Sequence, residues 1–297
     1  DAGDGNGDDD GRQPRADGHR DRHREDQRGE RLQRVDDQVD RAARDRDVAG
    51  AVRGATRPGP DHDLRTPVPV AGTGGHVLSV QERAGEKLSL VCVDESEEYL
   101  EIARAKATAA NVPLVFQPGR VDGLNFADDE FDVVIGEGSL VKPERIAGMV
   151  SEMVRVARPG AVVALVLPTA SSFGEFFSVY WEVLHNSGVE HEANIEGLIS
   201  ELPNVSEVEA LAENAGLEGV TSISRIEEFR YDSGDQFVNS PLISDFLMKR
   251  WIELVPEESR AQVAAEIPRV VDEDRQHADF MFSVKATLVK GRKAQTH

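Results

Sequence analysis

Asp94 is the residue of this sequence whose type and position most clearly suggest chemistry. It directly follows Leu88–Val93, a short apolar run rich in β-branched residues that predicts a strand covered on both faces. Ser96 can cap the next helix through its hydroxyl, and acids follow it in the first turn. An acid at the carboxyl end of a parallel strand is placed to bind ribose hydroxyls in an α/β nucleotide fold. The alternative is that Asp94 serves only as a turn or cap residue.

Two more polar loops come directly after predicted strands. The strand Pro113–Phe116 leads into a loop that contains Arg120, and the strand Phe131–Ile135 leads to Glu137. Because the carboxyl ends of parallel strands meet at one edge of a sheet, these loops are expected to lie near Asp94.

General bases and metal ligands are harder to assign. Glu137, His185 and His191 are the candidates for a base that removes a proton from a substrate. No spacing singles one of them out, so we assign no catalytic residue. The two histidines match no common pattern of metal ligands, and we predict no metal site.

The elements that position these residues alternate between strand and helix. Pro143 begins a predicted helix that ends at Pro159-Gly160, and Ala161–Leu167 is an uninterrupted apolar strand. This alternation predicts an α/β fold: a Rossmann-like, doubly wound, mostly parallel sheet with right-handed crossovers.

The stretch before Leu88 departs from this plan. Val77, Leu78 and Val80 form a short strand candidate, and the glycines of Gly72–Gly75 precede it. In a nucleotide fold the glycine-rich turn follows the first strand. We therefore expect the first glycine-rich motif to be missing or disrupted.

The part from Leu88 to Leu167 resembles a class I S-adenosylmethionine-dependent methyltransferase of the small-molecule type. The similarity lies in the order of VCVDESEEYLEIARAKA, NFADDEFDVVIGEGSL and EMVRVARPGAVVALVLP. It implies S-adenosyl-L-methionine as cofactor, with Asp94 on the ribose. It also implies a set of further cofactor-binding positions: Glu95, Arg120, Val121, Glu137 and Gly138.

The resemblance has one departure in the loop beside the adenine. The family usually has an acid there, and this sequence has Arg120. Asp122 could substitute for that acid if the loop were shifted. The resemblance also implies that Asp279–Lys290, which alternates with period two, is the final, antiparallel strand.

Composition divides the chain into two parts. Residues 1–72 contain 17 acids, 14 arginines and only two leucines, so we expect a disordered, low-complexity segment. A second hypothesis is that this segment is translated out of register. Residues 73–297 are expected to form the methyltransferase-like domain. We predict a helical insertion or cap around residues 170–204 and further helices over residues 240–275. The apolar stripe of Phe173–Leu184 is either a wall over the substrate or, as the spacing favours, ordinary core.

Charge and cysteine content limit the functional classes. Residues 73–297 hold 38 acids and 20 bases, which argues against nucleic acid as a partner. The single cysteine, Cys92, allows no disulfide framework, and no membrane span or signal peptide is visible, so we expect a cytoplasmic protein. The sequence does not define the oligomeric state.

The favoured interpretation is an enzyme that transfers a methyl group from S-adenosyl-L-methionine to a small-molecule acceptor. Two alternatives stay open. One is a methyltransferase-like binding or scaffold protein that no longer takes the cofactor. The other is an NAD-dependent oxidoreductase, because an acid after the second strand also suits the ribose of NAD.

Overall fold

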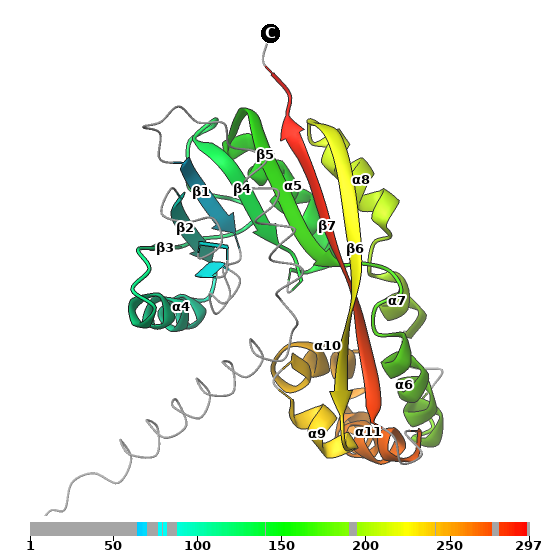
Figure 1. Ribbon diagram of the computed structural model, residues 1–297. Coiled ribbons are helices and arrows are strands. Elements are labelled where there is room, and N and C mark those ends of the chain that lie inside the picture. Colours follow the sequence, from blue (N-terminus) through cyan, green and yellow to red (C-terminus); the bar gives the residue numbers. More distant parts are fainter. Residues whose placement is uncertain are drawn as a thin grey trace, which may run out of the picture.

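The computed structural model describes residues 64–69, 77–78, 80–81, 88–139, 141–189, 195–240, 242–274 and 279–295 (Figure 1). Seven strands form its framework: β1 (Leu64–Pro69), β2 (Leu88–Asp94), β3 (Val115–Pro118), β4 (Phe131–Glu137), β5 (Ala157–Pro168), β6 (Leu217–Tyr231) and β7 (Phe280–Lys293).

Strand order and direction agree with a Rossmann-like sheet. Strand β2 pairs in parallel with β1 and β3, and β4 pairs in parallel with β5. Strand β7 runs antiparallel between β5 and β6, and β1 lies alongside β4. The spatial order is therefore β3-β2-β1-β4-β5-β7-β6. This confirms the predicted α/β fold with its antiparallel final strand.

Helices cover the sheet and build a second, helical lobe. The longer helices are α4 (Glu97–Ala109), α5 (Pro143–Val156), α6 (Gly174–Asn186), α8 (Val205–Asn214) and α11 (Arg260–Asp274). Shorter turns are α7 (Ile195–Ser200), α9 (Gly234–Asn239), the π-helix Leu242–Leu247, α10 (Met248–Glu253) and the 3₁₀ turn Glu257–Ser259. Figure 1 shows α6, α9, α10 and α11 gathered around the far half of the long β6–β7 ribbon.

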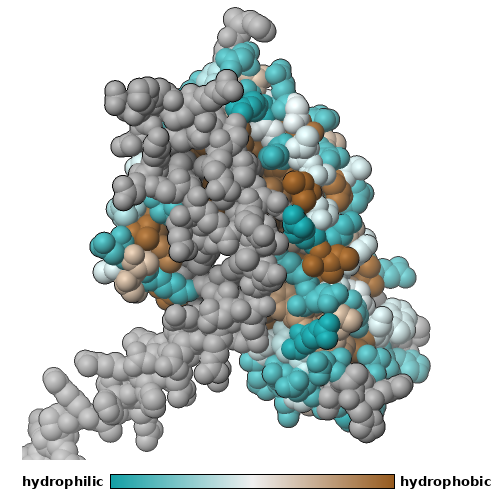
Figure 2. Space-filling view, viewed as in Figure 1, coloured by the Kyte–Doolittle hydropathy of each residue, from teal (hydrophilic) through white to brown (hydrophobic). Residues whose placement is uncertain are grey.

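The apolar core follows this division. Two clusters lie against the sheet, one around Met149 and Leu165 and the other around Leu90 and Ile135. A third cluster fills the helical lobe and is rich in aromatic side chains, with the ring of Trp251 stacked on that of Phe176 at 3.8 Å between centroids. On the face drawn in Figure 2, the coloured surface is mostly hydrophilic and its hydrophobic residues form small separate patches.

The start of the fold differs from the sequence-based prediction. Val77, Leu78, Val80 and Gln81 are helical, so the strand predicted there is wrong. The strand that pairs with β2 is β1, which lies inside the segment 1–72 that we expected to be disordered. The folded part therefore begins no later than Leu64. Residues 1–63 lie outside the described residues.

Two helix details follow from local contacts. Helix α11 continues through Pro268, and Val263, Ile267, Val270 and Val271 are all fully buried on its inner side. Helix α8 begins at a capping box in which the side chain of Asn204 accepts from the backbone N–H of Glu207 at 3.0 Å.

Candidate cofactor site at the strand ends

Asp94 ends β2, and its side chain is only 6% exposed. Its Oδ1 accepts a hydrogen bond from the backbone N–H of Ser96 at 2.8 Å, and the Ser96 hydroxyl accepts from the N–H of Tyr99 at 3.3 Å. The predicted cap of α4 is thus present. Asp94 also shapes the turn before α4, which is the role that the alternative interpretation gave it.

The loop after β3 lies directly beside Asp94. The carbonyl of Asp94 accepts from the N–H of Gly119 at 3.0 Å, and Pro118 is the register partner of Asp94 in β3. Val121 follows in this loop with 3% exposure. A buried apolar residue and a buried carboxylate are therefore brought to neighbouring strand ends, as the sequence predicts.

Arg120 and Asp122 pair with one another in this loop. The Nε and Nη2 atoms of Arg120 both donate to the Asp122 carboxylate at 3.1 Å, and Arg120 is largely exposed. Asp122 also accepts from Arg145 Nε at 2.9 Å and from Arg145 Nη2 at 2.7 Å. These bonds lower the pKa of Asp122, with Arg145 as the larger cause. Both Asp122 oxygens are engaged by guanidinium groups.

Glu95 belongs to the same ion cluster. Its carboxylate accepts from both terminal nitrogens of Arg145, one of them Nη1 at 3.2 Å, and from the backbone N–H of Val121 at 3.4 Å. The bond from Arg145 is the main reason that the pKa of Glu95 is lowered. Arg145 lies in the first turn of α5 and was not predicted as a site residue. No local sequence signal marks it, because its partners are 23 and 50 residues away.

The end of β4 supplies the other predicted positions. The Glu137 side chain accepts from the backbone N–H of Ser139 at 3.1 Å and also from the Ser139 hydroxyl. Gly138 is buried, and a Cβ there would lie 3.2 Å from Ile146 Cδ1 and 3.3 Å from Leu167 Cβ. The backbone is therefore tightly packed at this turn, and a side chain at position 138 would crowd it.

The predicted positions form two groups along one sheet edge. Asp94, Glu95 and the Arg120–Val121 loop lie together, whereas Glu137 ends β4 and Gly138 follows it, on the far side of β1. With neighbouring strands about 4.8 Å apart, the ends of β2 and β4 are roughly 10 Å from each other. That span suits an extended ligand better than a single small group.

The remaining base candidates are not at this edge. His185 lies exposed in the last turn of α6, which belongs to the helical lobe, and His191 lies outside the described residues. Glu137 is the base candidate that the fold places at the strand ends.

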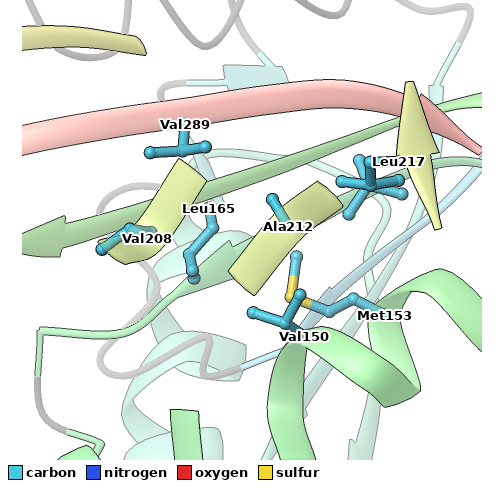
Figure 3. Close-up of a pocket in the computed structure, with 8 residues that line it drawn as sticks. Val150, Met153, Leu165, Val208, Ala212, Leu217 and Val289 are labelled. Atoms are coloured by element: carbon cyan, nitrogen blue, oxygen red, sulfur yellow. The ribbon is translucent and has the colours of Figure 1, made fainter. Parts of the chain in front are cut away.

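A small cavity of about 10 Å³ lies away from the strand ends (Figure 3). Its walls come from α5, α8 and strands β5 to β7, through Val150, Met153, Val163, Leu165, Val208, Ala212, Leu217 and Val289. All eight lining residues are apolar, so it is a packing void of the core and holds no polar group to orient a ligand.

Comparison with known proteins gives a consistent class. Residues 70–160 match a family described as a methyltransferase domain. This match covers less than half of the chain, and it agrees with the resemblance of its motifs to class I S-adenosylmethionine-dependent methyltransferases. The match begins one residue after β1 and includes Gly72–Gly75 and Asp94.

Two relatives each match a stretch of this chain at just over 30% identity. A 118-residue stretch is 34% identical to the demethylmenaquinone methyltransferase of Shouchella clausii, covering 37% of this chain and 49% of that enzyme. A 105-residue stretch is 31% identical to an uncharacterized protein of Mycobacterium tuberculosis, covering 35% and 37% of the two chains. The chain thus spans less than half the length of these relatives.

A solved structure supports the fold over more of the chain. The YcgJ protein of Bacillus subtilis superposes with a TM-score of 0.54 at 19% identity, covering 84% of this chain and 98% of that one. At this identity the similarity concerns the fold alone. Within the described residues, no helix is long and apolar enough to cross a membrane.

Proposed function

We propose that this protein transfers a methyl group from S-adenosyl-L-methionine to a small-molecule acceptor. The observation that carries the proposal is the buried carboxylate of Asp94 at the end of β2, beside the buried Val121 of the next loop. Supporting it, residues 70–160 match a methyltransferase domain.

The site residues fit the adenosine part of this cofactor. A carboxylate can accept hydrogen bonds from the two ribose hydroxyls, and the Asp94 carboxylate lies at the end of β2, where such a ligand binds in nucleotide folds. Val121 is an apolar residue beside Asp94 that suits the adenine face. Gly138 directly follows β4 at the same sheet edge, where the other end of the ligand would lie, and its own packing against Ile146 and Leu167 accounts for the glycine.

The order of the elements along the chain supports a glycine-rich turn after β1, which lies between β2 and β4 in the sheet. Gly72–Gly75 come after β1 and before the helical residues that start at Val77, which is the order strand, glycines, helix. The expectation of a missing motif rested on a strand at Val77–Val80, and those residues are helical. The glycines themselves lie outside the described residues, so their part in binding is proposed from order alone.

When bound, the cofactor supplies a methyl group that its sulfonium centre already activates. The protein then has to bind and orient the cofactor and the acceptor at the strand ends and to exclude water there. Glu137 is placed to hold or accept a proton near Ser139, but we assign it no step. The acceptor is proposed to be small and not a nucleic acid, since acids exceed bases by 18 over residues 73–297. The cytoplasmic location stays a prediction.

The apolar stripe of Phe173–Leu184 was one candidate for a wall over the acceptor. Phe176, Tyr180 and Leu184 are fully buried in the aromatic cluster of the helical lobe, which supports ordinary core packing over a wall that faces substrate. Trp181, at 48% exposure, points away from that core.

One observation favours the alternative of a cofactor-free binding protein. Arg120 stands where the family usually has an acid, and Asp122 cannot easily replace that acid because both its oxygens pair with guanidinium groups. The amino group of adenine would then lack a carboxylate partner. Weaker cofactor binding than in relatives with that acid is the expected consequence.

Calorimetric titration separates these possibilities. We expect heat with S-adenosylhomocysteine and none with NAD, and loss of the first signal in Asp94→Asn. Asp132→Asn is the matched control, because Asp132 is a half-buried acid of β4 that pairs with Arg158 at the opposite end of the sheet. Silence with both ligands would favour the binding protein, and heat with NAD alone would favour an oxidoreductase.

A further inference from the structure

Arg145 joins three elements around the candidate site. It belongs to the first turn of α5, whereas Glu95 follows β2 and Asp122 lies in the loop after β3. Its guanidinium donates to Asp122 through Nε and Nη2 and to Glu95 through Nη1 and Nη2. A planar guanidinium that forks onto two carboxylates sets their separation and orientation more strictly than a point charge would.

We infer that Arg145 is a positioning residue for the adenosine half of the cofactor. It holds the loops after β2 and β3 at the spacing that places Val121 beside Asp94. The inference rests on the proposed function, and it adds a residue from α5 to the predicted positions.

The contacts of Val121 give the mechanism. Val121 lies between Arg120 and Asp122 in sequence, and its N–H is within 3.4 Å of Glu95 Oε1. Both acids that flank this N–H are held by Arg145. Neither acid is free to swing toward a ligand, so their role is to fix the backbone. The same guanidinium lowers the pKa of both acids, which keeps them ionised and paired at neutral pH.

Burial differs between the two ion pairs of the cluster. The side chains of Arg145 and Glu95 are 27% and 41% exposed, and that of Asp122 is 15% exposed. The Arg145–Glu95 pair is screened by water and adds little to the free energy of folding, whereas the more buried Arg145–Asp122 pair adds more. Removing the guanidinium should therefore change ligand affinity and lower the stability, which is why the melting temperature is measured beside the affinity.

The test compares Arg145→Met with Arg158→Met. Arg158 of β5 also pairs with an acid of the sheet, Asp132 at 2.5 Å, but this pair lies at the amino end of β4, away from the candidate site. We expect Arg145→Met to weaken binding of S-adenosylhomocysteine by about tenfold, with 5′-methylthioadenosine losing the same factor because it shares the adenosine. Arg158→Met should bind like the wild type, and both variants should have similar melting temperatures.

Two more variants separate positioning from charge and from stability. Arg145→Lys keeps the charge without the fork, so its affinity should also fall. The double variant Glu95→Gln/Arg145→Met should bind no more weakly than Arg145→Met, since the two side chains act as one unit.

The outcomes distinguish this inference from the proposed function. Wild-type affinity in Arg145→Met, with binding lost in Asp94→Asn, would overturn the role of Arg145 and leave the proposed function standing. The role would also be overturned if Arg145→Met melted far below Arg158→Met while Arg145→Lys kept the wild-type affinity. That result would assign the guanidinium to stability and not to the placement of the loops. No binding by the wild type would overturn both.

Discussion

Replacing Gly234 by alanine should destabilise the helical lobe. Gly234 begins α9 and packs against α11, where a Cβ would lie 2.0 Å from the carbonyl oxygen of Pro268. Because that atom belongs to backbone, no side-chain rotation relieves the overlap. The helices must separate by about 1 Å or more to reach an ordinary contact, which strains the hydrogen bond from Gly234 N–H to Asp272 at 2.9 Å. The packing of Phe237, fully buried on the same helix, is disturbed as well.

The size of the effect follows from these two losses. Overpacking costs about 1–3 kcal/mol, and a weakened buried hydrogen bond adds about 1 kcal/mol, so Gly234→Ala should lower the free energy of unfolding by roughly 2–4 kcal/mol. For a domain of this size the melting temperature should fall by about 5–15 °C.

The matched control is Gly174→Ala at the same position of α6. A Cβ at Gly174 meets no atom within 4 Å, so this variant should be neutral or gain up to about 0.5 kcal/mol. Urea and thermal denaturation measure both variants. A Gly234→Ala protein within about 0.5 kcal/mol of wild type would refute the close packing of α9 on α11.

Three further predictions concern single groups. Glu95 and Asp122 have lowered pKa values in the folded state, so their stabilising contribution is complete at neutral pH and is lost only as the pH falls below about 4. Urea denaturation midpoints of the wild type and of Glu95→Gln/Asp122→Asn measure this contribution. A contribution that is already lost between pH 7 and pH 5 would contradict the prediction. Burial raises the pKa of the Cys92 thiol to about 12, so a thiol reagent at pH 8 should modify it only after unfolding. Rapid modification of Cys92 in the folded protein would contradict this prediction. The Tyr180 hydroxyl donates to the Trp251 carbonyl at 2.8 Å, so Tyr180→Phe should cost about 1–2 kcal/mol in urea denaturation, and no loss would show that the bond is dispensable.

The sequence predicts the middle of the fold well because local and global signals agree there. Strand β2, the cap at Ser96 and the acid at position 94 are all set by neighbouring residues. The apolar run of β5 likewise reflects burial on both faces, which leaves a strong composition signal.

Strand β1 could not be predicted in the same way. Its sequence LRTPVP contains two prolines, which cannot donate to a ladder and normally exclude a central strand. Its position is set by β2 and β4 on either side, and those contacts are invisible locally. Val77, Leu78 and Val80 show the opposite case, since they were predicted as a strand and are helical. Three such apolar residues over four positions suit a short strand and a helix equally.

The site shows the same limit. Asp94 is predicted from its place after a strand, whereas the ion pairs of Arg145 join it to partners 23 and 50 residues away and become visible only in the fold. The departure at Arg120 was visible in the sequence, but its pairing with Asp122 was not.

The complex with S-adenosylhomocysteine tests the central claim most directly, through a crystal structure determined with the ligand present. We predict that the ribose hydroxyls lie within hydrogen-bonding distance of the Asp94 carboxylate, with the adenine against Val121. A ligand bound away from the end of β2, or crystals that stay free of it at saturating concentration, would contradict the account.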